Sequence, residues 1–123
     1  SDIMKPTGPT NPTTLRIMSA LRKHAKKESA ELWKDVATRI GKSTRMRPVV
    51  NTEKIEKYCK DGDVVVVPGK LLGQGSVSKK ITVSALFASK DAKKKIESAG
   101  GKYIGLLDAA KKYPKGSKVK IMA

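Results

Sequence analysis

The order of short extended and helical segments along this 123-residue chain predicts an α/β fold in a single small domain. Runs of β-branched residues alternate with helical patterns after residue 48, and two amphipathic helical patterns precede it. The first 14 residues, rich in proline and threonine, hold too little apolar surface to fold alone. We therefore expect an extended tail over 1–14 that RNA orders, and one domain over 15–123.

The domain divides by pattern into a helical part at 15–41, a basic loop at 42–48 and an α/β part at 49–123. The first helix is expected to begin at Thr13, with Thr13 or Thr14 as its cap. Its apolar face carries Leu15, Met18, Leu21 and Ala25. The second helix is expected over Ala30 to Ile40, behind a Ser29 cap, with Gly41 at its end.

The most informative segment of the α/β part is a four-valine run, 64–67, followed by a glycine-rich stretch. Valines favour a buried strand, and Pro68 with Gly69 is expected to end it. A turn from Lys70 to Lys80 then leads into a strand over 81–87. The remaining expected elements are a strand at 49–50, a short helix capped by Asn51 or Thr52, a helix from a Ser89 cap to Ala99, a strand at 102–104, a helix at 106–112 and a strand at 118–122.

The charge of the chain indicates an anionic partner. Lys and Arg number 27 against 11 Asp and Glu, which gives a formal net charge of +16. Such a surplus repels itself unless a polyanion or solvent screens it, so nucleic acid is the favoured partner. An anionic membrane is the alternative, but no apolar run approaches the roughly 18 residues of a spanning helix. A single cysteine and the lack of a secretion signal predict a soluble cytoplasmic protein.

The sequence contains few residues that are suited to catalysis. His24 is the single histidine and is expected to be solvated or to face RNA, while Cys59 is expected to be a half-buried apolar residue of a helix. One Cys and one His are too few to form a metal site of clustered soft ligands. The acidic residues over 53–63 alternate with lysines, as on a salt-bridged helix face. We expect no enzymatic activity, cofactor, metal or small-molecule substrate.

The basic loop and the glycine-rich turn are the candidate contacts to RNA. Lys42, Arg45 and Arg47 could bind phosphates, although an ordinary solvated charge run is the alternative. Lys70 and nearby backbone N–H groups form a second candidate phosphate site. Few aromatics are available for base stacking, which favours recognition of backbone and shape. The predicted RNA-binding residues are Lys5, Arg16, Lys42, Arg45, Arg47, Asn51, Lys54, Gly69, Lys70, Gly73, Gly75, Lys79 and Lys80.

Several motifs along the chain are similar to those of one ribosomal protein family. They are Lys5-Pro6-Thr7-Gly8-Pro9-Thr10-Asn11-Pro12, Arg45-x-Arg47-x-Val49-Val50-Asn51, Val64-Val65-Val66-Val67-Pro68-Gly69-Lys70-Leu71-Leu72-Gly73-x-Gly75, Val83-Ser84-Ala85 and Pro114-Lys115-Gly116-Ser117-x-Val119. With Trp33 in its amphipathic helix, they resemble large-subunit ribosomal protein eighteen of the archaeal and eukaryotic type. The resemblance implies a relation to bacterial large-subunit protein fifteen and a fold of irregular β-β-α turns.

The same resemblance implies a non-enzymatic role in translation. It suggests a ribonucleoprotein component that binds large-subunit ribosomal RNA among neighbouring ribosomal proteins in the cytoplasm. Our hypothesis is therefore a structural constituent of the large subunit that contacts RNA mainly through backbone phosphates and shape. The alternative is a small basic nucleic-acid chaperone or DNA-compacting protein; an enzyme with a phosphorylated substrate is a weaker one.

Overall fold

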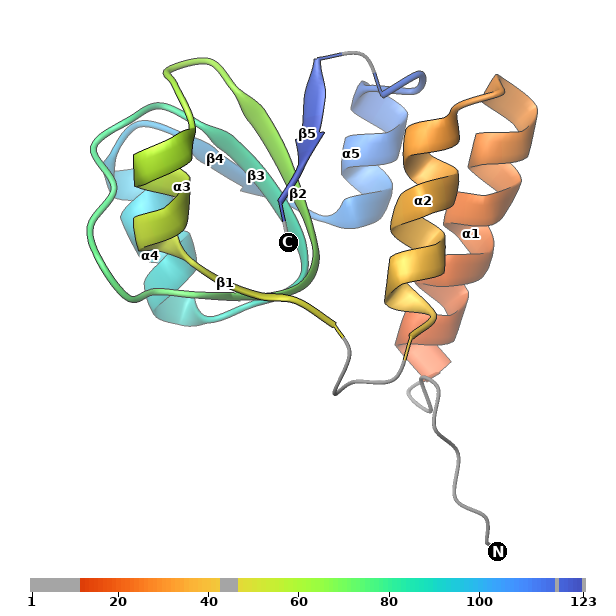
Figure 1. The fold of residues 1–123 in the computed structure, drawn as a ribbon, viewed down its shortest axis with the longest axis horizontal. Coiled ribbons are helices and arrows are strands. Elements are labelled where there is room, and N and C mark those ends of the chain that lie inside the picture. The colour runs from red at the N-terminus through yellow and green to blue at the C-terminus, as the bar shows by residue number, and fades with distance from the viewer. Residues whose placement is uncertain (1–11, 43–46, 117, 123) are drawn as a thin grey trace, which may run out of the picture.

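The computed structural model describes residues 12–42, 47–116 and 118–122, and it confirms a single small α/β domain (Figure 1). The helices are α1 (Pro12–Glu28), α2 (Glu31–Ile40), α3 (Thr52–Tyr58), α4 (Lys90–Ser98) and α5 (Leu106–Lys112). The strands are β1 (Val49–Asn51), β2 (Val64–Leu72), β3 (Thr82–Ala88), β4 (Lys102–Ile104) and β5 (Val119–Ile121). The expected order of elements is confirmed.

All strand pairs in the sheet are parallel. β3 pairs with β2 along most of its length and with β4 on its other edge. Because β3 occupies one edge of β2, the other edge holds both β5, against Val64–Val66, and β1, against Lys70–Leu72. The segment 73–81 is therefore a crossover between parallel neighbours, and the order β2, β3, α4 has the expected β-β-α form.

Strand β2 does not end at Pro68 and Gly69, which corrects the expectation from sequence. It continues to Leu72, with a shift in register against β3 between Val67 and Lys70. Proline has no N–H to donate to a regular ladder of hydrogen bonds, so within a sheet it is tolerated at such an irregularity. A Cβ on Gly69 would lie 2.1 Å from the Pro48 carbonyl oxygen, so glycine permits this close approach. The Lys70 N–H donates to the same oxygen at 3.0 Å.

The two faces of the sheet bury separate apolar clusters. Val64 and Val66 of β2 pack in the cluster formed with α1, α2 and α5. Val65 and Val67 point the other way, into the cluster with α3 and α4. Figure 1 shows the same arrangement, with α3 and α4 on one side of the sheet and the remaining helices on the other. The alternation expected for strand side chains thus builds a three-layer domain.

His24 is part of the packing between the helices and the C-terminal segment, whereas the sequence predicts a solvated or RNA-facing side chain. It is half-buried, its ring lies edge-on to Trp33 at a centroid distance of 6.5 Å, and its Nε2 donates to the Pro114 carbonyl at 3.1 Å. Trp33 is fully buried and its Nε1 donates to the Tyr113 carbonyl at 2.8 Å. These contacts fix residues 113–114 against α1 and α2.

Local signals placed most helix ends well and failed at three. Helix α1 begins at Pro12, so Thr13 and Thr14 lie in its first turn, inside the stretch expected as tail. Ser29 has a φ of 54° and the N-cap of α2 is Ala30, without a side-chain cap. The N-cap of α3 is Asn51, but neither its side chain nor that of Thr52 caps the helix. By contrast, the expected Ser89 cap of α4 is confirmed, because its side chain accepts from the Ala92 N–H.

Replacing Trp33 tests the packing of the C-terminal segment. Trp33→Phe should lower the free energy of unfolding by about 2–4 kcal/mol, because it leaves a void and removes one of the two hydrogen bonds that the Tyr113 carbonyl accepts, the other coming from the Gly116 N–H. Urea unfolding followed by circular dichroism measures the change. The control is Tyr58→Leu at a side chain that is 61% exposed, which should stay within about 0.5 kcal/mol of the wild type. Equal losses in both variants would contradict this account.

Candidate nucleic-acid interface

The structure brings the end of the basic loop beside the predicted lysine of β2. Pro48, which follows Arg47, accepts the Lys70 N–H and lies against Gly69. Arg47, Gly69 and Lys70 line one shallow hollow of about 100 Å³ together with Pro48, Val49, Leu86 and Phe87. Two motifs that are well separated in sequence thus form one cationic surface. We call this hollow and its lining residues the Arg47–Phe87 surface.

Arg47 also has a structural partner. Its Nε donates to the Ile40 carbonyl at 3.1 Å, at the last residue of α2, so the side chain ties the basic loop to that helix. Partial burial removes water from the guanidinium and lowers the pKa of Arg47 from its usual value. Its Nη2 is buried and has no hydrogen-bond partner among the residues that the structure describes.

The glycines of the crossover allow close packing against helices. A Cβ on Gly73 would lie 2.7 Å from the Asp91 Cβ, and one on Gly75, whose φ is +90°, would lie 2.5 Å from the Glu53 Cβ. The Gly75 carbonyl accepts from Lys95 Nζ at 2.6 Å, and the Gly73 carbonyl accepts from the same ammonium group. Thr52 Oγ1 donates to the Gln74 carbonyl at 2.9 Å. The carbonyls of this loop therefore face the domain, and a phosphate contact by either glycine remains a prediction.

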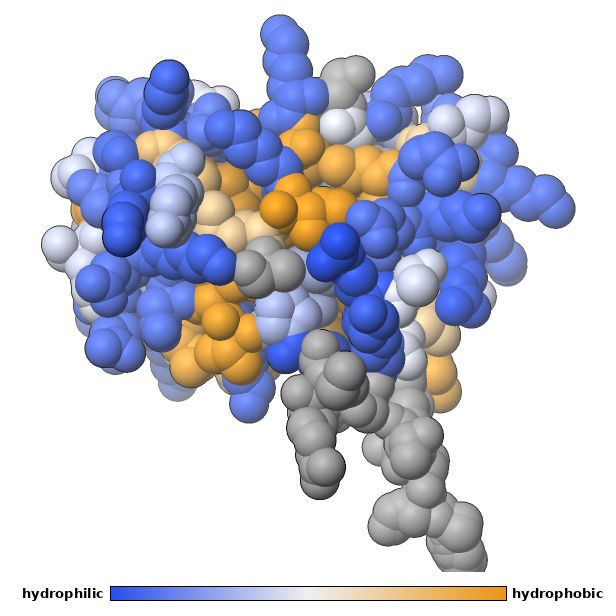
Figure 2. Space-filling model, viewed as in Figure 1, coloured by the Kyte–Doolittle hydropathy of each residue, from blue (hydrophilic) through white to orange (hydrophobic). Residues whose placement is uncertain are grey.

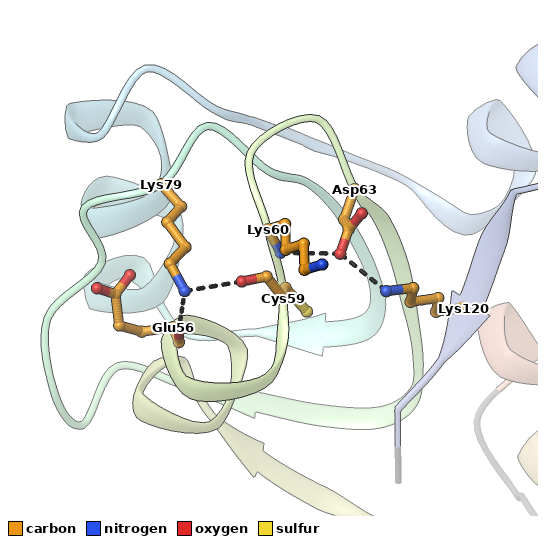
Figure 3. Close-up of polar contacts among 6 residues, drawn as sticks. All are labelled: Glu56, Cys59, Lys60, Asp63, Lys79 and Lys120. Carbon is orange, nitrogen blue, oxygen red and sulfur yellow. Dashed lines mark hydrogen bonds and ion pairs between the residues drawn. The ribbon is translucent and has the colours of Figure 1, made fainter.

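Lys79 stabilises the end of a helix. Its Nζ donates to the carbonyls of Glu56 at 2.6 Å and Cys59 at 2.8 Å, which are C-terminal carbonyls of α3 (Figure 3). A cation at this place also opposes the negative end of the helix dipole. Lys79 and Lys95 are thus lysines with internal partners, and sequence alone gives no sign of this because both partners are backbone groups.

Three acidic residues of 53–63, namely Glu56, Asp61 and Asp63, bind groups outside α3, whereas the sequence predicts a salt-bridged helix face. Glu56 accepts from the Ser78 N–H at 3.0 Å and its hydroxyl at 2.6 Å, and these bonds lower the pKa of Glu56. Asp61 accepts from the Lys80 N–H at 2.9 Å. Asp63 accepts from the Lys60 N–H and from Lys120 Nζ, both at 2.9 Å, and both bonds lower the pKa of Asp63 (Figure 3).

The other predicted contact residues are dispersed over the surface. Arg16 is exposed on α1, and Lys42 is exposed just after α2. Lys80 is exposed at the end of the crossover, whereas Asn51 and Lys54 are half-buried at the start of α3. Lys5 and Arg45 lie outside the described residues. Figure 2 shows hydrophilic side chains over most of the visible face, with apolar surface beneath β1 and between β5 and α2.

Two exposed apolar side chains of the Arg47–Phe87 surface are not among the contact residues predicted from the sequence. Phe87 is 54% exposed and Val49 is 58% exposed, although both lie in strands. Strict alternation along β3 predicts Phe87 on the same face as the buried Val83 and Ala85, so it does not reveal the exposure of Phe87.

The chemistry of the described residues is that of a binding surface. Across 12–42, 47–116 and 118–122, no group of three His, Cys, Asp or Glu side chains could hold a metal ion. Cys59 is fully buried, not half-buried as expected, and burial raises the pKa of its thiol, which opposes formation of a reactive thiolate. Within these described ranges, no helix is long and apolar enough to cross a membrane.

Comparison with known proteins identifies the family. Residues 29–104 match the model of a ribosomal protein family whose description names the 50S proteins L15 and L18e together with a 60S counterpart. The large ribosomal subunit protein eL18 of Methanococcus maripaludis is 43% identical over 120 residues, which cover 98% of this chain and all of the relative. The chain belongs to this family. In Pyrobaculum aerophilum, eL18 is 44% identical over 95% of this chain and 96% of its own length.

Membership in this family confirms the resemblance inferred from the sequence motifs. A third relative, eL18 of Sulfurisphaera tokodaii, is 45% identical over 94% of this chain and 95% of its own length. The family consists of structural ribosomal proteins and is not known for enzymatic activity. The chain is therefore a ribosomal protein of the large-subunit eL18 type and not an enzyme.

Replacing the neighbouring residues Lys79 and Lys80 in turn compares a lysine with internal hydrogen-bond partners to an exposed one. Lys79→Met should lower the free energy of unfolding by about 1–3 kcal/mol, since two carbonyls at the end of α3 lose their donor. Lys80→Met, at an exposed side chain, should change it by less than about 0.5 kcal/mol. Urea titrations of both variants measure the difference, and an unaffected Lys79→Met would show that the helix end needs no cation.

The Glu56 contact predicts a pH-dependent stability. Because hydrogen bonds from Ser78 lower the pKa of Glu56 below its ordinary 4.5, the folded state favours the carboxylate. This stabilisation is complete above the ordinary value and is lost as the pH falls through the lowered pKa. The wild type should therefore melt above Glu56→Gln at pH 7, and the difference should vanish as the pH drops well below 4.5. A difference in Tm that persists in acid would contradict this assignment.

Proposed function

We propose that this ribosomal protein binds large-subunit ribosomal RNA mainly through backbone phosphates and shape, beside neighbouring ribosomal proteins. The observation that carries the proposal is the Arg47–Phe87 surface, where the guanidinium of Arg47 and the exposed Lys70 lie around one hollow. Arginine binds phosphate with a planar fork and lysine binds it as a point charge. Lys42, exposed after α2, adds a further cation on the same basic loop.

The internal partners of the acidic residues strengthen this proposal. Glu56 and Asp61 accept hydrogen bonds from backbone N–H groups of the crossover, and Asp63 is shared between a backbone N–H and Lys120. These carboxylates hold the loops together, and most of their bonds go to uncharged groups. The formal net charge of +16 already counts these carboxylates, and it favours a polyanion outside the chain as the partner.

The source of RNA selectivity follows from the chemistry of the surface. Contacts to phosphates position a protein on RNA but carry no sequence information. Folded RNA offers shape and 2′-hydroxyl groups that a rigid surface can distinguish. The three-layer domain supplies such rigidity, because β2 is buried on both faces through Val64–Val67. Selectivity then depends on the fixed placement of Arg47, just before β1, and of Lys70 in β2.

A salt titration tests the proposal. Each phosphate contact contributes about 0.7–0.9 to the slope of log affinity against log salt. Lys42→Gln and Lys70→Gln should therefore each reduce the slope by about that amount in filter binding to protein-free large-subunit ribosomal RNA. Lys120→Gln is the control, because its ammonium is paired with Asp63 of the same chain, and it should leave the slope unchanged.

The same assay separates the alternatives. Slopes equal to that of the wild type for Lys42→Gln and Lys70→Gln would remove this surface from the RNA interface. A DNA-compacting protein or general chaperone would bind duplex DNA of the same length as tightly as ribosomal RNA at the same salt concentration. Preference for ribosomal RNA is the expected outcome, since the relatives are large-subunit proteins.

A further inference from the structure

We infer that the ring of Phe87 stacks with one unpaired nucleobase of the ribosomal RNA, at the uncovered end of the sheet. The inference rests on the proposed RNA binding and deepens it, because it adds a base contact to a surface otherwise described by phosphate contacts. Aromatic rings stack with any nucleobase through their π-faces, so the contact needs an exposed ring with cations near it. The structure supplies both at Phe87.

The strand register places three side chains in one row. Val49 of β1 lies opposite Lys70 of β2, and Lys70 lies opposite Phe87 of β3. The next residues along the three strands, Val50, Leu71 and Ala88, are buried in the cluster with α3 and α4. Since successive side chains of a strand point to opposite faces, Val49 and Lys70 share the other face, and Phe87 lines the same hollow beside them.

That other face is covered by helices only in part. Val64 and Val66 of β2 are buried on it beneath the helical layer of α1, α2 and α5. Farther along the same strand Lys70 is exposed, and its neighbours Val49 and Phe87 are 58% and 54% exposed. Figure 2 shows apolar surface beneath β1 with hydrophilic residues around it. Two exposed apolar side chains that flank a lysine at the end of a sheet favour a contact surface.

The surroundings of the row favour a nucleotide over a protein segment. The hollow beside Phe87 measures about 100 Å³, which is too small for a helix of about 10 Å diameter. Its lining includes two cations, Arg47 and Lys70, and no carboxylate. A base on the ring would therefore bring its own phosphate close to positive charge. The buried Nη2 of Arg47 is a donor without a described partner on the same lining.

Lys70 lies over the ring in the isolated protein and does not block it. Its Nζ is 5.9 Å from the centroid of Phe87, at the outer limit of a cation–π contact. The lysine stem is flexible and its side chain is exposed, so the ammonium can move to a phosphate when a base approaches. Lys70 can thus lie over the ring when RNA is absent and bind the RNA backbone when RNA is present.

Tyr58 is a natural comparison within the same chain. It is 61% exposed, and Lys57 Nζ lies 5.5 Å from its ring centroid. The hollow beside Tyr58, however, is also lined by Glu53, whose charge repels a phosphate. Tyr58 is therefore a matched aromatic control. Its ring is exposed and lies near a lysine, but the charged residues around its hollow include a carboxylate.

Photo-crosslinking tests the contact directly. Irradiation at short ultraviolet wavelengths joins aromatic side chains to bases that stack on them. The full chain is irradiated with protein-free large-subunit ribosomal RNA, digested with nuclease and trypsin, and analysed by mass spectrometry. The peptide 81–90 should carry a nucleotide, because Phe87 is its one aromatic residue. Absence of a nucleotide on 81–90 in a sample that binds RNA would overturn the inference.

Affinity measurements on Phe87 variants give a second readout. Phe87→Leu should weaken RNA binding roughly tenfold, as expected for the loss of one stacked base. Phe87→Trp should restore the wild-type affinity, since tryptophan keeps an aromatic face. The salt slope should stay unchanged in both variants because no charge is removed. Tyr58→Leu should bind as the wild type does, and circular dichroism checks that all variants fold.

The outcomes separate this inference from the proposed function. If the wild type shows no salt-dependent binding to ribosomal RNA, the proposed function fails. If it binds and Phe87→Leu binds equally well, RNA binding stands and stacking is refuted. Equal weakening by Phe87→Leu and Phe87→Trp would also refute stacking, because it would indicate a side chain that matters only for shape, as in a contact with another protein.

Discussion

Strand β2 constrains the rest of the sheet because it pairs with β1, β3 and β5. Its first half holds β5 and its second half holds β1, and the change between them occurs at Pro68 and Gly69. The absence of a Cβ at Gly69 allows the Pro48 carbonyl to approach and accept the Lys70 N–H. This one close contact sets the end of the basic loop against the sheet. Arg47 reaches the side of Lys70 as a consequence.

The polar groups of the domain fall into internal and external sets. Lys79 and Lys95 donate to carbonyls of α3 and of the crossover, while Glu56 and Asp61 accept from the backbone of that crossover. These bonds replace a regular secondary structure over residues 73–81, where the chain passes between two parallel strands. The internal set therefore secures a long crossover, whereas Lys42 and Lys70 are exposed on the surface proposed for RNA.

Sequence reasoning recovered the elements whose signals are local. The Ser89 cap, the end of α2 at Gly41 and the four-valine strand all depend on neighbouring residues. The failures depend on contacts far along the chain. His24 bonds to Pro114, β2 continues past Pro68 because β1 pairs with its second half, and Phe87 is exposed where the helical layer ends. Likewise, a charge count cannot separate Lys79 from Lys80, since carbonyl partners leave no trace in composition.

The exposed end of the sheet connects packing to recognition. The helical layer covers β2 at Val64 and Val66 but stops short of the row of Val49, Lys70 and Phe87. Leaving Val49 and Phe87 in water forgoes the stabilisation that burial would bring, so the free protein is less stable there than a fully covered sheet would be. A partner that covers the row recovers this stabilisation upon binding. Because Arg47 and Lys70 line the hollow at the same place, a nucleotide can bury the ring and neutralise the cations together, which ordinary phosphate contacts cannot do.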